Sequence, residues 1–230
     1  MKKIGIIGAM QVEIDLLINK VQNLTKFTYA GFPFYHGELF SNEIIITNSG
    51  VGKVNAAACT QLLIDQFSVY SIINTGIAGS LDEAVKIYDV VISSDVTHHD
   101  VRVEQKKNLF PFQETFQADK QLIELALQTC AYLKLNSTYH LGRIVSGESF
   151  IEDIEEKTRI VKNYAPACVE MEGSAIAQVA HINKVPFVII RSISDNADEN
   201  TTLDYKKYEE MAANQSAQIV LGMLSEMKWP

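Results

Sequence analysis

The sequence has few cysteines, and none has the spacing of a metal site. The three residues, Cys59, Cys130 and Cys168, are odd in number and far apart, and no CxxC pair occurs. This excludes a zinc ribbon, whose ligands come in closely spaced pairs. Scattered thiols are typical of a reducing compartment, so we expect buried, free cysteines in a cytoplasmic protein.

Basic residues are also scarce. Lys and Arg number 20 against 28 Asp and Glu, which gives a formal net charge of −8 at pH 7. The densest basic pairs, Lys2-Lys3, Lys106-Lys107 and Lys206-Lys207, are small and scattered. Because nucleic-acid phosphates are bound by clustered Lys and Arg, we expect no nucleic-acid partner.

Long apolar runs are absent. No run reaches the length of about 18 apolar residues that a transmembrane helix needs, so we expect no membrane span. The short apolar run near the N-terminus is interrupted by Gln11, Glu13 and Asp15. These polar residues come too early for a signal peptide.

Complete nucleotide-binding loops are missing too. Gly5 and Gly8 lack the G-x-G-x-x-G spacing of a dinucleotide fingerprint. Residues 48–54 resemble half a phosphate loop, but Thr47 replaces the first glycine and Val54 replaces the expected Ser or Thr. We expect no cofactor, and a tight turn here whose helix amides can still meet a polar ligand.

Two adjacent histidines, His98 and His99, lie between Asp95 and Asp100 and raise the question of a metal site. Neighbouring residues on a strand point to opposite faces of the sheet. No H-E-x-x-H or comparable spacing occurs either. We therefore predict no metal site.

Strand-like and helix-like segments alternate along the 230 residues. This order predicts an α/β fold with a mainly parallel central sheet flanked by helices. No repeat or low-complexity linker interrupts it, so residues 1–230 are expected to form a single domain. The expected strands are 4–7, 44–47, 71–74, 87–94, 140–147, a short one before 170, and 186–190. A hairpin is expected over 27–39. Helices are expected after residue 10, over 54–67, 119–133 and 154–163, from 174 onward, and over 205–227.

Two connecting segments stand out. Residues 75–80 are predicted to form a glycine-rich turn, and residues 102–117 a polar and aromatic loop. Phe110 and Phe112 flank Pro111 in that loop. Exposed loop aromatics often meet a partner or cover a site, and equally they can simply attach the loop to the core.

Carboxylates follow several predicted strands at their carboxyl ends, where ligands bind in open α/β sheets. Glu13 follows the first strand, Glu170 and Glu172 follow the short strand, and Asp195 follows the last. Any one of them has an ordinary structural explanation, such as a helix dipole for Glu13 or a helix cap for Asp195. Their shared position in the sheet predicts a chemical site.

Six short stretches, spread in order over almost the whole chain, share a pattern with one family. They are Ile4–Met10 with Glu13, Ser49–Val54, Ile73–Gly76, Val145–Gly147 with Phe150, Val169–Glu172, and Arg191 with Ser194 and Asp195. In this combination the chain resembles the bacterial 5′-methylthioadenosine/S-adenosylhomocysteine nucleosidases of the purine nucleoside phosphorylase-like superfamily. The resemblance implies a mixed sheet wrapped by helices, and a homodimer whose partner contributes to the 5′-thio pocket.

The resemblance also implies hydrolysis of the N-glycosidic bond between adenine and a 5′-thio-substituted ribose. Glu13 would activate water, Asp195 would protonate adenine N7, and Glu172 would hold the ribose hydroxyls. The other implied roles are the Met171 backbone beside the ribose, Phe150 stacked on adenine, the Ile151 backbone at the adenine edge, Arg191 ordering the water and the acids, Tyr205 covering the ribose, and Met10, Val51, Ile77, Gly79 and Ser194 as further substrate contacts.

These residue types suit that chemistry. Breaking an N-glycosidic bond builds positive charge on the ribose, which carboxylates stabilise as in glycoside hydrolysis. Negative charge builds on the leaving base and is neutralised by a protonated acid. The two roles need opposite protonation states at one pH, and burial or an arginine partner can separate the pKa values.

Two departures from the family pattern leave alternatives open. Ile77-Ala78-Gly79 stands where the family has Ser-Ala-Gly, and the loop from Asp100 to Phe116 is shorter and lacks the usual aromatic-glycine pattern. One alternative is a non-catalytic adenine-nucleoside binding protein. The other is a nucleoside phosphorylase of the same superfamily, but Asn74 and Ile77 stand where phosphorylases supply Arg and Ser for phosphate.

Overall fold

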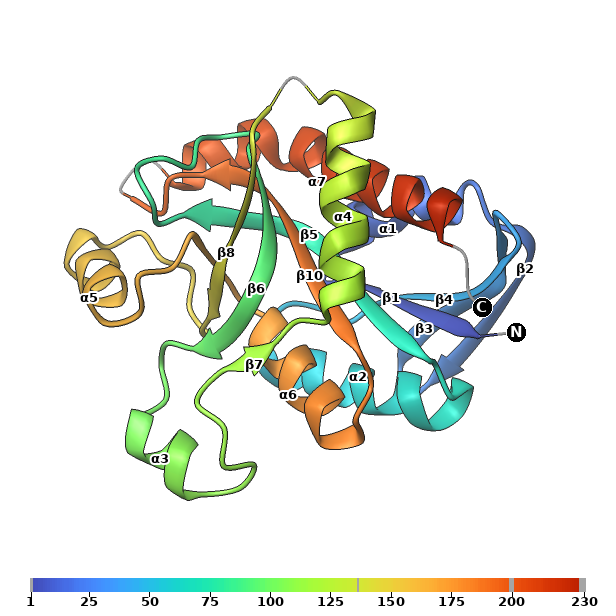
Figure 1. Cartoon of the computed structure of the whole chain (residues 1–230), viewed down its shortest axis with the longest axis horizontal. Coiled ribbons are helices and arrows are strands. Elements are labelled where there is room, and N and C mark those ends of the chain that lie inside the picture. Colours follow the sequence, from blue (N-terminus) through green and yellow to red (C-terminus); the bar gives the residue numbers. More distant parts are fainter. Residues whose placement is uncertain (1, 136, 199–200, 228–230) are drawn as a thin grey trace.

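A computed structural model describes residues 2–135, 137–198 and 201–227 of the chain. Figure 1 shows strands gathered in the centre and helices around them. In chain order the elements are β1 (Lys3–Gly8), α1 (Gln11–Ile18), β2 (Gln22–Tyr29), β3 (Phe32–Leu39), β4 (Asn42–Asn48), α2 (Lys53–Phe67), β5 (Ser71–Ser80), β6 (Val90–His98), α3 (Val103–Asn108), β7 (Phe116–Gln117), α4 (Lys120–Leu133), β8 (Tyr139–Ser146), α5 (Ile154–Tyr164), β9 (Cys168–Glu170), α6 (Gly173–Asn183), β10 (Phe187–Asp195) and α7 (Thr201–Glu226).

The α/β fold is confirmed, and the sheet is mixed. Its centre is parallel, since β1 pairs in parallel with β4 and β5, and β5 does so with β10. Antiparallel pairs join β2 to β3 and β3 to β4 at one side. At the other side β10, β6, β8 and β9 follow in order, and β9 pairs again with β5, so these five strands close into a ring.

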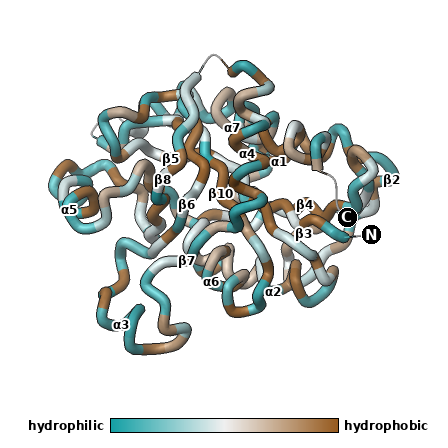
Figure 2. The backbone as a smooth tube through the Cα atoms, in the orientation of Figure 1, coloured by the Kyte–Doolittle hydropathy of each residue, from teal (hydrophilic) through white to brown (hydrophobic). Residues whose placement is uncertain are grey.

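Helices cover both faces of this sheet. Helices α1 and α4 pack against α7 on one face, and α2 packs against α6 on the other. The apolar runs explain this layering, because strands covered on both faces are apolar throughout. Ile44–Ile46 in β4 and Val188–Ile190 in β10 are fully buried. In Figure 2 the hydrophobic colouring runs through the middle of the molecule.

Several predicted details are confirmed, and two segments differ from expectation. The predicted hairpin forms from β2 and β3, and the helix predicted over 119–133 is α4, which Asp119 caps by accepting hydrogen bonds from Gln121 N and Leu122 N. The glycine-rich segment 75–80 is not a turn, because β5 continues through it to Ser80. The segment 102–117 is not wholly a loop, because it contains α3 and β7.

Cys59, Cys130 and Cys168 are buried and free, and burial raises the pKa of the first two thiols to about 11. Within the described part of the chain, no helix combines the length and the apolar character that crossing a membrane requires. Over the same residues, no group of three or more His, Cys, Asp and Glu side chains is placed to hold a metal ion.

Candidate active site

A cavity of about 350 Å³ opens where the carboxyl ends of β1, β5, β9 and β10 meet. This is the position at which parallel strands deliver ligand-binding residues. All of the predicted site residues line it: Met10, Glu13, Val51, Ile77, Gly79, Phe150, Ile151, Met171, Glu172, Arg191, Ser194, Asp195 and Tyr205. Strands distant in sequence thus bring the predicted set together, and none of its members lies elsewhere.

Glu13 lies in the first turn of α1 and is 1% exposed. Its Oε2 accepts hydrogen bonds from Ala9 N (2.6 Å) and Met10 N (2.9 Å), as expected for an acid at a helix start. Its Oε1 accepts a third from Ile77 N at 3.1 Å, which ties α1 to β5. Burial raises the pKa of Glu13, although Arg191 and the three N–H groups favour the carboxylate.

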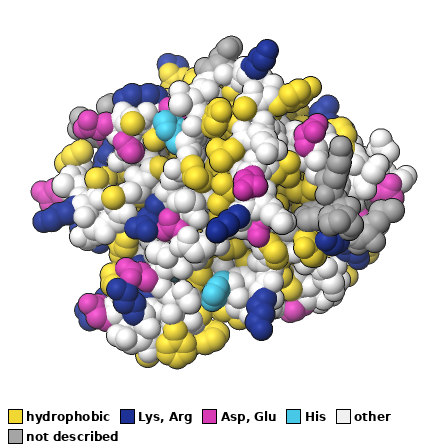
Figure 3. All heavy atoms as spheres, in the orientation of Figure 1, with side chains coloured by type: hydrophobic (Ala, Val, Ile, Leu, Met, Phe, Trp, Pro, Cys, Tyr) yellow, Lys and Arg dark blue, Asp and Glu magenta, His cyan; other side chains and the backbone are white. Residues whose placement is uncertain are grey.

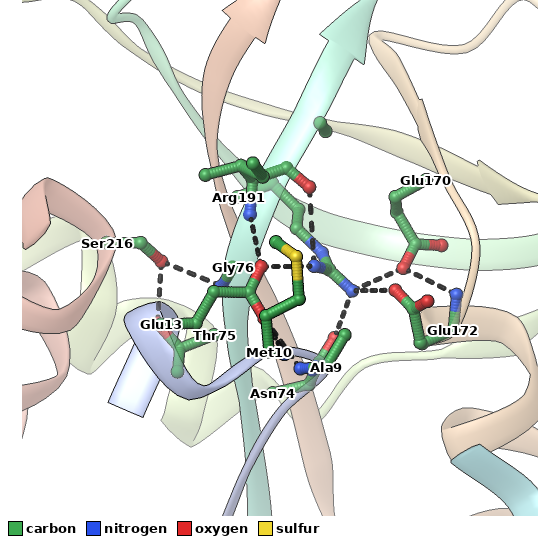
Figure 4. Close-up of polar contacts among 12 residues, drawn as sticks. Ala9, Met10, Glu13, Asn74, Thr75, Gly76, Glu170, Glu172, Arg191 and Ser216 are labelled. Atoms are coloured by element: carbon green, nitrogen blue, oxygen red, sulfur yellow. Dashed lines mark hydrogen bonds and ion pairs between the residues drawn. The ribbon is translucent and has the colours of Figure 1, made fainter. Parts of the chain in front are cut away.

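Arg191 lies at the centre of one end of the cavity and is 1% exposed (Figure 4). Its Nη2 donates to Asn74 Oδ1 at 2.8 Å, to Glu170 Oε2, and to Glu172 Oε2 at 3.4 Å. Its Nη1 lies 3.8 Å from Glu13 Oε1. One guanidinium therefore faces three carboxylates, an arrangement that holds all three in fixed positions.

The two glutamates after β9 have different partners. Glu170 accepts hydrogen bonds from Glu172 N (3.0 Å), Gly173 N (2.7 Å), Ser146 Oγ and Arg191, so it caps α6 as well as bracing the arginine. Glu172 accepts one from Gly52 N at 2.9 Å. Burial raises the pKa of Glu172 to about 8, with Glu170 and Glu13 adding to the effect against Arg191. Burial and the neighbouring carboxylates thus favour the protonated form of Glu172.

A glycine makes this cluster possible. A Cβ at Gly76 would lie 2.1 Å from Arg191 Nη1 and 2.4 Å from Glu13 Oε1, which is closer than any real contact. The Gly76 N–H is satisfied from the other side by Ser216 Oγ of α7 at 3.1 Å. β5 therefore passes directly behind the arginine and the carboxylate.

The second end of the cavity is built around Asp195, which is 2% exposed. Its Oδ2 accepts a hydrogen bond from Ser194 Oγ at 2.7 Å, and its Oδ1 one from Ala197 N at 2.9 Å. A Cβ at Gly79 would lie 2.6 Å from Asp195 Oδ1. Burial raises the pKa of Asp195 above the usual range of an aspartate, against the hydrogen bonds that favour its charged form.

Aromatic side chains form the rim. Phe150 is 45% exposed, and its ring lies edge-on to Tyr205 with centroids 5.5 Å apart. The Tyr205 hydroxyl donates to Glu209 Oε1 at 3.0 Å, and its oxygen lies 3.2 Å from Met10 Sδ. An exposed ring beside an acidic cavity offers a stacking face for a planar ligand.

Ile77 is 7% exposed and packs against Ala212 and Ala213 of α7. Its side chain therefore contributes to the apolar side of the cavity, while its backbone N–H holds Glu13. The hydroxyl that the family pattern has at this position is replaced by a contact between β5 and α7.

Several residues that build this cavity are not among the predicted site residues. Glu170 is an acid at a strand end whose contact with Arg191 the sequence does not predict. Asn74, Gly76 and Ser146 lie in the motif stretches but have no predicted role of their own. A signal was present for two of them, since Asn74 and Gly76 directly follow an apolar strand, the position at which site residues are expected.

The chain is also similar in sequence to known proteins. Residues 3–225 match the model of the Phosphorylase superfamily. A 5′-methylthioadenosine/S-adenosylhomocysteine nucleosidase from Staphylococcus aureus (strain JH9) is 42% identical, over 97% of this chain and 100% of that protein.

Two solved structures show the same fold. A 5′-methylthioadenosine/S-adenosylhomocysteine nucleosidase from Colwellia psychrerythraea 34H in complex with adenine superposes with a TM-score of 0.94 at 38% identity, covering 99% of this chain and 96% of that one. A futalosine hydrolase mutant from Helicobacter pylori strain 26695 has a TM-score of 0.93 at 30% identity, covering 99% and 100%. The chain belongs to the Phosphorylase superfamily and, within it, to the 5′-methylthioadenosine/S-adenosylhomocysteine nucleosidases.

Proposed function

We propose that this protein hydrolyses the N-glycosidic bond of 5′-methylthioadenosine and S-adenosylhomocysteine, releasing adenine and the 5-thio-substituted ribose. One observation carries the proposal: the buried acids stand at two separate ends of one cavity. Gly76 lies against Glu13 and Gly79 lies against Asp195, and these two glycines are about 10 Å apart along β5 at roughly 3.3 Å per residue. A nucleoside between them presents its sugar to one end and its base to the other.

Asp195, at the end of the cavity that takes the adenine, is the general acid. Its raised pKa keeps a proton available, and that proton passes to adenine N7 as the C1′–N9 bond breaks. The electron pair of the bond leaves with the base, which departs neutral. A protonated carboxylic acid in a buried site is an established way to supply general acid at neutral pH.

Glu13, at the end of the cavity that takes the ribose, is the general base. A water between Glu13 and the ribose attacks C1′ and gives its proton to the Glu13 carboxylate. The three backbone N–H groups and Arg191 favour its charged form, against the burial that raises its pKa. They also fix its orientation, which matters because positioning accounts for much of the rate in such reactions.

Binding of the sugar and the base follows from the rest of the lining. Glu172 and the Met171 backbone take the ribose hydroxyls, and a substrate that lacks a hydroxyl leaves a buried acid unpaired. Phe150 stacks on adenine and the Ile151 backbone reads its edge. The remaining members of the lining that we assign to the substrate are Met10, Val51, Ile77, Gly79, Ser194 and Tyr205.

The charge of the site argues against a phosphorylase. Arg191 is the one Lys or Arg among the described residues that line the cavity. Its guanidinium already faces Glu13, Glu170 and Glu172. Phosphate would therefore enter a site of net negative charge whose one cation is already paired. Binding an anion needs cationic hydrogen-bond donors that are available to it. Water is the nucleophile that this site accepts.

We also propose one domain, a cytoplasmic location and a homodimer. One sheet takes strands from β1 to β10, and the free, buried thiols suit a reducing compartment. Figure 3 shows hydrophobic side chains gathered over α3 and the segment after it. Leu109, Phe110 and Phe112 are 57%, 70% and 62% exposed there, and a second copy covering them would explain this exposure.

The experiment is adenine release from methylthioadenosine in phosphate-free buffer, followed by ultraviolet absorbance and repeated with S-adenosylhomocysteine. We expect release with both substrates and no change on adding phosphate. A strict phosphate requirement, with ribose 1-phosphate as product, would make the protein a phosphorylase. Tight adenine binding without turnover would make it a binding protein.

A further inference from the structure

A chain of buried polar contacts runs away from the site toward His98. Ser146 Oγ donates to Glu170 Oε1, and Ser174 N donates to Ser146 Oγ at 2.7 Å. Ser174 Oγ in turn lies 2.7 Å from His98 Nδ1. Since Glu170 also accepts from Arg191, the contacts are continuous from the histidine to the guanidinium (its inner end is drawn in Figure 4).

The sheet builds this chain by register. His98 of β6 is paired with Ser146 of β8, and Ser146 is paired with Glu170 of β9. Residues in register on neighbouring strands point to the same face, so their side chains meet. All three are buried, and Ser174, which joins them from the first turn of α6, is fully buried. The alignment is therefore set by the backbone pairing.

The protonation state of His98 follows from its second partner. His98 Nε2 lies 2.9 Å from Gln178 Oε1. A carboxamide oxygen only accepts hydrogen bonds, so Nε2 carries the ring proton and Nδ1 accepts from Ser174 Oγ. Burial lowers the pKa of His98, in agreement with a neutral ring. The two hydroxyl hydrogen bonds therefore have a fixed direction. The Ser174 hydroxyl donates to His98 Nδ1, and the Ser146 hydroxyl donates to Glu170.

The surroundings hold the ring in place. Phe116 lies edge-on to it with centroids 6.4 Å apart. Lys106, which is 6% exposed, donates to Thr97 Oγ1 and to His98 O at 2.9 Å each. The charged groups around the ring are Lys106, Lys53 and Asp100, and Lys53 and Asp100 are paired with each other at 2.6 Å.

We infer that His98 is a positioning residue for the proposed hydrolysis: through Ser174, Ser146 and Glu170 it fixes Arg191, and with it the water-activating end of the cavity. The inference rests on the proposed function. This role affects turnover but not adenine binding, whereas a general structural role would affect both. The series of polar contacts that starts at His98 ends at Arg191. Asp195 and Phe150 are held by other contacts, so adenine binding does not depend on His98.

Three variants test this. His98→Phe fills the space and removes both hydrogen bonds, His98→Asn retains a polar group near the position of Nδ1, and Gln178→Met removes only the outer partner. We expect His98→Phe to lower kcat by about tenfold to a hundredfold, the range of a small misplacement of catalytic groups. The dissociation constant for adenine should stay within about twofold, and His98→Asn should recover most of the rate. Gln178→Met should lose less than His98→Phe, because it leaves the contact between His98 and Ser174 in place.

The outcomes separate the two proposals. A wild type that is silent in the hydrolysis assay would overturn the proposed function and this inference with it. An active wild type, with His98→Phe at the same kcat, would overturn the inference alone. So would a His98→Phe variant that loses adenine binding in step with kcat. If His98→Phe does not fold, Ser174→Ala tests the same link, because it keeps the backbone N–H and loses only the hydroxyl; an unchanged kcat there would also overturn it.

Discussion

Asp195 and Ser194, neighbours in β10, are joined by a 2.7 Å hydrogen bond in which the serine hydroxyl donates to the carboxylate. The backbone N–H of Ala197 donates to the other oxygen. Arg191, four residues earlier in the same strand, is instead paired with Glu170. One strand thus carries a guanidinium surrounded by acids and a buried acid whose donors here are neutral groups, and burial raises the pKa of that acid.

Replacing Asp195 by Asn should remove this proton donor. Asn has nearly the same shape and can still accept from Ala197 N, so we expect a folded protein. Turnover should fall by at least about a hundredfold, since a general acid contributes 10²–10⁴ in rate. Adenine release from methylthioadenosine measures the effect, and the thermal midpoint is the folding control. A folded variant with a normal rate would remove Asp195 from the acid role.

Glu13→Gln tests the opposite end of the cavity. The carboxylate accepts three backbone hydrogen bonds through two oxygens, and an amide must turn an N–H toward one of those donors. We expect a loss of about 1–3 kcal/mol in stability and at least about a hundredfold in kcat. Asp15→Asn is the matched control, because Asp15 is an exposed acid of the same helix whose side chain accepts from Gln11 Nε2. Equal activity of the two variants would assign water activation to another group.

The sequence was informative about the site because its residues follow strands. Glu13, Arg191 and Asp195 each come at or after an apolar run, and the parallel pairing of β1, β5 and β10 brings those ends together. The ring closure of the sheet was not predictable, because it depends on β9 pairing with β5 over only Gly79 and Ser80. Residues 75–80 were predicted as a turn because glycines suggest one, but here they allow β5 to pass behind Arg191 and Asp195.

The raised pKa of Glu172 predicts a pH dependence of stability. Burial raises the pKa of this carboxyl from its ordinary value of 4.5 to about 8 in the folded protein. Since the folded state binds the proton more tightly, this group's contribution to stability is complete below about pH 4.5 and is lost as the pH rises toward 8. Glu172→Gln should therefore flatten the fall in thermal midpoint between pH 5 and 8. Asp65→Asn, at an exposed acid of α2, should leave the slope unchanged; a Glu172→Gln slope equal to that of the wild type would contradict the assignment.

Ile77→Ser tests the replacement of a family hydroxyl by an apolar contact. The isoleucine side chain packs against Ala212 and Ala213, and truncating a buried isoleucine costs about 2–5 kcal/mol. We expect a loss near 2 kcal/mol in urea unfolding, because one side of Ile77 faces the cavity, and Ile77→Val should lose about 1 kcal/mol or less. The backbone N–H that holds Glu13 is unchanged by the substitution.

The effect of Ile77→Ser on the rate should have the opposite sign. A hydroxyl at position 77 adds one hydrogen-bonding group to the sugar end of the cavity, and a hydrogen bond contributes about 1 kcal/mol, or roughly fivefold in kcat/KM. We therefore expect a folded Ile77→Ser variant to hydrolyse methylthioadenosine severalfold faster and Ile77→Val to match the wild type. Lower stability without any gain in rate would mean that Ile77 serves only the packing of β5 on α7, and that the water is ordered fully by Glu13 and Arg191.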